Sequence, residues 1–189
     1  MQTKEYQMEI YHELKSIFGN ENVKKEWNTT EFDPHPSSHT QIYAPFLDIA
    51  VGPFNPFWDL DIGNDLTEVM KTHPFTRRIV QEIRWDENDY INSWNKFSRC
   101  YLAIEIEFSG KKHSNSLKHI FGSMINASVN GSIGIIITDS NTKNKVDRLF
   151  SYVLRLRQVS GIIIPIIDNL IRIEKDDFTS ILMKVKDEL

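Results

Sequence analysis

The chain has 189 residues, of which 40% are hydrophobic and 25% are charged, a composition typical of a globular protein with one substantial core. Its formal net charge of -4 does not indicate a polyanion-binding protein, although a local basic patch can coexist with an acidic total. The single cysteine, Cys100, excludes an internal disulfide and a cysteine-based zinc site, and the longest apolar runs are far shorter than a membrane span. We therefore expect one domain over residues 1–189, cytoplasmic and without a membrane segment.

The N-terminal part of the chain is expected to form a helix followed by a strand. An apolar residue recurs every three or four positions over residues 4–18, which predicts an amphipathic helix. Apolar and charged residues then alternate over residues 22–29, a pattern typical of a strand, and the charge favours the edge of a sheet. The next segment is rich in Pro and Ser, and we interpret its histidines, His35 and His39, as surface residues because no third metal ligand accompanies them.

Residues 42–54 are predicted to form a second strand that carries one acid in an apolar setting. We expect Leu47 and Ile49 on one face and Asp48 on the other, among small side chains. Small neighbours leave room beside Asp48 for a ligand or an ion. The alternative is a structural acid that pairs with a nearby lysine or arginine.

Residues 55–99 are expected to form a helical insertion. Asn64 or Asp65 is a candidate cap for a short helix, and Pro74 suits the first turn of another helix that runs to Ile83. The segment is also rich in aromatic and basic residues. That composition fits either a surface that meets nucleic acid or a buried aromatic core.

Two glutamates lie two positions apart within the apolar stretch at residues 101–109. Because strand side chains alternate, Glu105 and Glu107 share one face with Ala103, and the large apolar residues of the stretch share the other. Two ionised carboxylates side by side in apolar surroundings need a partner, a metal ion or a shifted pKa. This pair is therefore the first candidate for a functional site.

The rest of the pattern predicts an α/β protein. A helix that ends at Asn130 leads from the glutamate strand to a nearly continuous apolar strand at residues 133–138, as in a βαβ crossover with parallel strands. We then expect a basic amphipathic helix over residues 142–159, a buried strand over 162–167 and a last helix over 176–185. The predicted architecture is a central mixed sheet flanked by helices.

Asp48, Glu105 and Glu107 together suggest a metal site. Three carboxylates that converge on one face of a sheet can hold a hard divalent cation through oxygen ligands, and the main-chain carbonyl of Ile106 is a candidate for a further ligand. The cation we expect is Mg²⁺ or Mn²⁺. The alternative is a solvated sheet face on which the same acids pair with lysines.

Residues 45–48 (PFLD) and 105–107 (EIE) resemble the motif of the PD-(D/E)xK nuclease superfamily, and the predicted order of helix, three strands, helix and strand is similar to its restriction-endonuclease-like core. The resemblance implies a metal-dependent endonuclease that hydrolyses DNA phosphodiester bonds in restriction or defence, with Asp48, Glu105 and Glu107 as metal ligands and catalytic residues. Dimers are common among such nucleases, so a homodimer is compatible with the resemblance.

The chain departs from this motif at two points. Two residues separate the proline from Asp48, and Glu107 stands where the family usually has lysine. Glu107 then acts as a ligand or a base, or a lysine from elsewhere reaches the site, and the candidates are Lys111, Lys112 and Lys118. The first helix of such proteins often contributes an acid, for which Glu9 and Glu13 are candidates. Alternatively, the chain is a catalytically inactive module of the same fold that binds nucleic acid or a protein partner.

Overall fold

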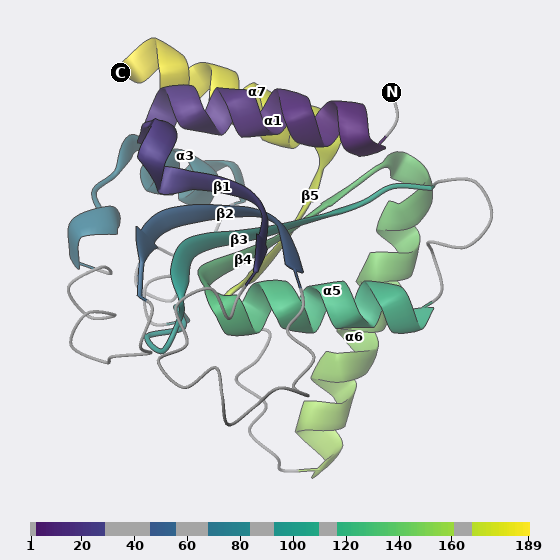
Figure 1. Cartoon of the computed structure of the whole chain (residues 1–189). Coiled ribbons are helices and arrows are strands. Elements are labelled where there is room, and N and C mark those ends of the chain that lie inside the picture. The colour runs from purple at the N-terminus through teal and green to yellow at the C-terminus, as the bar shows by residue number, and fades with distance from the viewer. Residues whose placement is uncertain (1–2, 29–45, 56–67, 84–92, 110–116, 161–167) are drawn as a thin grey trace, which may run out of the picture.

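The structure, a computed structural model, describes residues 3–28, 46–55, 68–83, 93–109, 117–160 and 168–189. Within these ranges the chain forms a five-stranded sheet with the strand order β1-β2-β3-β4-β5 (Figure 1). The strands are β1 (Val23–Asn28), β2 (Phe46–Phe54), β3 (Cys100–Glu107), β4 (Gly131–Thr138) and β5 (Leu170–Glu174). Neighbours are antiparallel from β1 to β3 and parallel from β3 to β5, so the sheet is mixed, as predicted.

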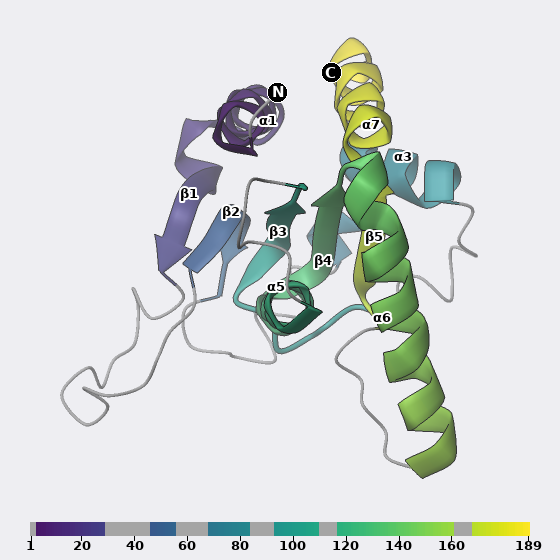
Figure 2. The ribbon, with the colours of Figure 1, turned by 90° about the vertical axis from the view of Figure 1, so that its right-hand side faces the viewer.

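Helices cover both faces of the sheet (Figure 1 and Figure 2). One face carries α1 (Thr3–Phe18), α3 (Pro74–Ile83) and α7 (Lys175–Glu188), and the other carries α5 (Leu117–Asn130) and α6 (Ser140–Ser160). Each face has its own core, because the apolar side chains of the strands divide between these two groups of helices. The prediction of an α/β protein with a mixed sheet flanked by helices is confirmed.

The two central strands are joined through α5. Both β3 and β4 are buried along their whole length and run parallel, which confirms the predicted βαβ crossover. The helix lies close to the sheet because Gly134 has no side chain: a Cβ at this position would lie 2.8 Å from the main-chain carbon of Ala127. This close approach brings polar side chains of α5 within hydrogen-bond distance of β3.

Side chains of β1 and β2 change faces where these strands pass Glu26 and Asp48. The register between the strands omits this pair, and Glu26 has a φ of 47°. Ile49 packs on the side of α1, whereas Leu47 packs with Trp27 on the side of α5. The expectation that Leu47 and Ile49 share a face is therefore wrong, because the regular pairing of β2 with β1 is interrupted at Asp48, whose side chain instead binds the main chain of β3.

Near the C-terminus, the helices expected over residues 142–159 and 176–185 are present as α6 and α7. The strand expected over residues 162–167 lies outside the described residues. The fifth strand of the sheet is instead β5, a short segment that the sequence analysis did not single out, and it lies at the edge of the sheet.

The described part of the expected insertion at residues 55–99 contains α3, which begins at Pro74 as predicted, and a helical turn at residues 68–70. The ring of Phe75 in α3 packs edge-on against Phe178 of α7, with ring centroids 6.2 Å apart. The insertion therefore contributes to the core on the α1 side of the sheet. No helix in the described ranges has the length and apolar character needed to cross a membrane.

Candidate functional site

The two glutamates of β3 point toward α5 and are almost completely buried. Glu105 is 7% exposed and Glu107 is 4% exposed, and Ala103 of the same strand packs on the same side, in the α5 core. Ile104 and Ile106 pack on the opposite side. The predicted division of this strand into an acidic face and an apolar face is confirmed.

Asp48 joins the glutamates where β2 separates from β3. The ladder between these strands ends at Ile49 opposite Ile104, while β3 continues to pair with β4 as far as Glu107. In the gap, Asp48 Oδ2 accepts a hydrogen bond of 2.8 Å from the main-chain N–H of Ile106. The side chain of Asp48 therefore replaces a main-chain partner and is held beside Glu105.

Two side chains of α5 bind the buried glutamates directly. Ser123 Oγ donates a hydrogen bond of 2.6 Å to Glu107 Oε1, and Asn126 Nδ2 donates one of 2.5 Å to Glu105 Oε1. His119 Nε2 lies 3.3 Å from Glu107 Oε1, and the histidine side chain is 57% exposed. Because these three residues are four and three positions apart, one face of the helix presents all of them to the carboxylates.

Burial has the largest effect on the pKa values of Asp48, Glu105 and Glu107. It raises the pKa of Glu105 well above the usual glutamate value, the charge of Asp48 raises it further, and the hydrogen bond from Asn126 opposes both effects. Burial also raises the pKa of Glu107, against the effects of Ser123 and His119. The pKa of Asp48 is raised by burial and lowered by the Ile106 N–H and by a hydrogen bond from the carboxyl of Glu105. Burial therefore favours the protonated form of each of these carboxyl groups, most strongly for Glu105.

The described residues supply no lysine or arginine to these acids; His119 is the basic side chain within reach. Lys118, predicted as a catalytic residue, is exposed on α5, and within the described ranges it makes no ion pair with the carboxylates. Lys111 and Lys112 lie outside the described residues, as do His35 and His39.

The acids of the first helix also lie elsewhere. Glu9 is exposed, and Glu13 pairs with Lys186 of α7 at 2.7 Å. The residue of α1 that reaches the site is Gln7, whose Nε2 donates to the main-chain oxygen of Asp48 at 3.0 Å. It binds the carbonyl at the point where the β1–β2 register is interrupted.

Five residues of the site were not predicted from the sequence, and they are Gln7, Glu26, His119, Ser123 and Asn126. The charge of Glu26, which stands across from Asp48 in β1, raises the pKa of Asp48. A signal for the helix residues existed: the polar positions 119, 123 and 126 recur at helical spacing in an otherwise apolar helix. Nothing comparable marks Gln7 or Glu26, which reach Asp48 through tertiary contacts.

The site contains oxygen ligands, but in this structure they do not surround a common position where a metal ion could bind. Within the described ranges, no three side chains of His, Cys, Asp or Glu form a ready set of ligands for a metal ion. The carboxylates instead accept hydrogen bonds from Ser123, Asn126 and the Ile106 N–H. The donor set still suits a hard cation, because it consists of carboxylates, and the C=O of Ile106 points to the side of β3 from which β2 has departed.

Comparisons with known proteins give no match to a family model, to a curated protein or to a solved structure. The geometry of the site is therefore the basis for a functional assignment.

Proposed function

We propose that the protein is a metal-dependent endonuclease that hydrolyses DNA phosphodiester bonds, with roles in restriction or defence. The observation that carries the proposal is the convergence of the half-buried Asp48 with the buried Glu105 and Glu107, without a lysine or arginine partner among the described residues. Three carboxylates in this setting need protons or a cation, and a divalent cation neutralises them most effectively.

The order of elements supports a restriction-endonuclease-like core. A helix precedes two antiparallel strands, a third antiparallel strand carries the glutamates, and a helix then leads to a parallel fourth strand. In this arrangement Asp48, Glu105, Glu107 and the carbonyl of Ile106 would hold Mg²⁺ or Mn²⁺. The bound ion would lower the pKa of a water molecule and stabilise charge on the phosphoryl group.

His119 takes the place that the motif assigns to lysine. It reaches Glu107 from α5 and remains accessible to solvent, so it can donate a hydrogen bond to a phosphate oxygen while it lies over the carboxylates. Lys118, exposed beside it, is assigned to the DNA backbone. Glu107 acts as a metal ligand, and Ser123 fixes the position of its carboxylate.

Cleavage of supercoiled plasmid DNA in Mg²⁺ or Mn²⁺ tests the proposal. Asp48→Ala, Glu105→Ala and Glu107→Gln are expected to abolish cleavage, with circular dichroism and thermal melting to confirm that each variant folds. Glu13→Gln is the matched control, because Glu13 forms a surface ion pair with Lys186 and should leave cleavage unchanged. Activity retained in all three site variants contradicts the proposal. Linear product formed without accumulation of nicked DNA would support a homodimer with two sites.

A second candidate is a catalytically inactive module of the same fold that binds nucleic acid or a protein. It is favoured by the glutamate at the position of the motif lysine and by the hydrogen bonds that already occupy the carboxylates. Calorimetric titration with Mn²⁺ separates the two functions. No binding at millimolar metal, or binding unchanged by Asp48→Asn, would favour the inactive module.

A further inference from the structure

A second feature of the molecule is a pocket of about 400 Å³ beside β5, the edge strand of the sheet. Residues of α6, α3 and α7 line it, together with Arg172, Ile173 and Glu174 of β5.

The edge of β5 presents main-chain groups to this pocket. The main-chain oxygen of Asn169 accepts a hydrogen bond of 3.0 Å from the main-chain N–H of Gly134. The main-chain oxygen of Ile173 accepts one of 3.4 Å from the hydroxyl of Thr138, so both oxygens point toward β4. Because main-chain direction alternates along a strand, the N–H and C=O of Arg172 and the N–H of Glu174 point outward. Nothing in the described ranges pairs with this outer side, since β5 is the last strand of the sheet.

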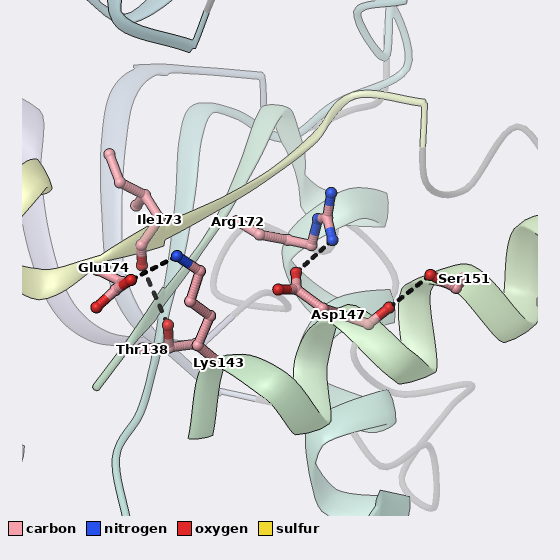
Figure 3. A network of polar contacts seen from close by, with 7 residues as sticks. All are labelled: Thr138, Lys143, Asp147, Ser151, Arg172, Ile173 and Glu174. Atoms are coloured by element: carbon pink, nitrogen blue, oxygen red, sulfur yellow. Dashed lines mark hydrogen bonds and ion pairs between the residues drawn. The ribbon is translucent and has the colours of Figure 1, made fainter. Parts of the chain in front are cut away.

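Two ion pairs between α6 and β5 line the pocket (Figure 3). Lys143 of α6 pairs with Glu174 at 2.5 Å, and Asp147 of α6 pairs with Arg172 at 2.5 Å. The guanidinium of Arg172 also lies 4.0 Å from the ring centroid of Phe150. These contacts tie α6 to β5.

The pocket has an excess of negative charge. Three cationic and four acidic side chains line it, and Lys184 pairs with Glu82 at 2.5 Å in addition to the two pairs that involve β5. The fourth acid, Asp177 in the first turn of α7, takes part in none of these three ion pairs. The pocket therefore favours a positively charged occupant.

Apolar side chains lie on both sides of the strand edge. Ile83 and Ile181 contribute from α3 and α7, and Val146 contributes from α6. A strand added to β5 would place alternate side chains against these two sides, because successive side chains of a strand point to opposite faces. The site thus offers main-chain pairing for affinity and two different walls for selection of side chains.

We propose that the open edge of β5 binds an extended basic segment of a partner protein by strand addition. The main-chain groups of Arg172 and Glu174 would pair with the segment, and a lysine or arginine of the segment would approach Asp177. The proposal is independent of the nuclease assignment, since the pocket shares no residue with the carboxylate site.

A fluorescent peptide in which valine and lysine alternate is the probe, and fluorescence anisotropy with the full chain measures its binding. The same peptide N-methylated on alternate amides cannot form the main-chain pairs, so its affinity is expected to fall about tenfold or more. A peptide of alternating valine and glutamate is expected to bind more weakly than the lysine peptide. No binding of the lysine peptide at millimolar concentration, or equal affinity of the methylated and unmethylated peptides, overturns the proposal.

Two further measurements locate the site. Amide hydrogen exchange by NMR is expected to slow at Arg172 and Glu174 on addition of the lysine peptide. Asp177→Asn is expected to weaken binding about threefold. The matched control is Asp176→Asn, since Asp176 lies in the same helical turn but is 90% exposed and outside the pocket. Equal effects of the two variants on binding also overturn the proposal. So does protection of these amides that grows with protein concentration in the absence of peptide, because it would indicate a second copy of the chain as the occupant.

Discussion

Replacing Asn126 with alanine removes a buried side chain that connects β2, β3 and α5. Asn126 Nδ2 donates to Glu105 Oε1 at 2.5 Å and to the main-chain oxygen of Phe46 at 3.3 Å, and Asn126 Oδ1 accepts from Asn130 at 2.9 Å. A hydrogen bond to a charged group contributes about 1.5 to 3 kcal/mol and a neutral one about 1 kcal/mol. Because the bond to Phe46 is long and Asn130 keeps a second acceptor, we expect the free energy of unfolding to fall by roughly 3 kcal/mol.

Urea denaturation in the presence of EDTA, followed by tryptophan fluorescence, measures this change. With a slope of about 2 kcal/mol per molar urea, the loss lowers the midpoint by about 1.5 M. The matched control is Asn141→Ala, because Asn141 is exposed and makes one hydrogen bond of 3.2 Å to Ser109, so its effect should stay within about 0.5 kcal/mol. The bond from Asn126 stabilises ionised Glu105, and the loss should therefore be smaller at acidic pH. A loss below about 1 kcal/mol, or no difference from the control, would show that these hydrogen bonds contribute little net stability and would contradict the prediction.

Three further predictions concern the same face of the sheet. Burial raises the pKa of Glu105, so the folded chain binds this proton more tightly than the unfolded chain does; the stability is present in full below about pH 4 and is lost as pH rises through the raised pKa. Glu105→Gln should remove this loss, so that at alkaline pH in EDTA the variant has a higher free energy of unfolding than the unmodified chain. Gly134→Ala should destabilise the protein because its Cβ would meet the main chain of α5, whereas Gly122→Ala, where the space is open, should stabilise it by about 0.5 to 1 kcal/mol. Asn169→Ala removes three bonds that its Nδ2 donates to main-chain oxygens and should lower the unfolding free energy by about 2 to 3 kcal/mol.

Each of these predictions has a result that contradicts it. For Glu105→Gln it is a pH dependence of stability identical to that of the unmodified chain in paired urea titrations. For the glycines it is a thermal melting shift of the same sign in Gly134→Ala and Gly122→Ala. For Asn169→Ala it is an unchanged urea midpoint, which would show that the buried amide contributes no net stability.

The predictable part of the fold was local. Residues 101–109 and 133–138 are apolar and short enough to be strands, and the helix between them has a clear period, so the crossover of β3, α5 and β4 could be predicted. The short edge strand β5 could not, because five residues with one exposed arginine carry too little pattern to distinguish them from a loop. The change of faces at Asp48 was equally hidden, since it depends on the interrupted pairing of β2 with β1 and on the bond between Asp48 and the main chain of β3.

For the candidate site, the residue pattern was enough to predict which acids share a face of β3 and that such a pair needs compensation, because strand alternation and the cost of buried charge are local and general. The surroundings of these acids depend on the packing of distant segments and could not be predicted. The tertiary structure places Ser123, Asn126 and His119 over the glutamates and leaves Lys118 in solvent. Successive residues of a helix are about 100° apart, so a shift of one position moves a side chain from the sheet to the solvent, and the face that α5 turns to β3 depends on its packing against the sheet.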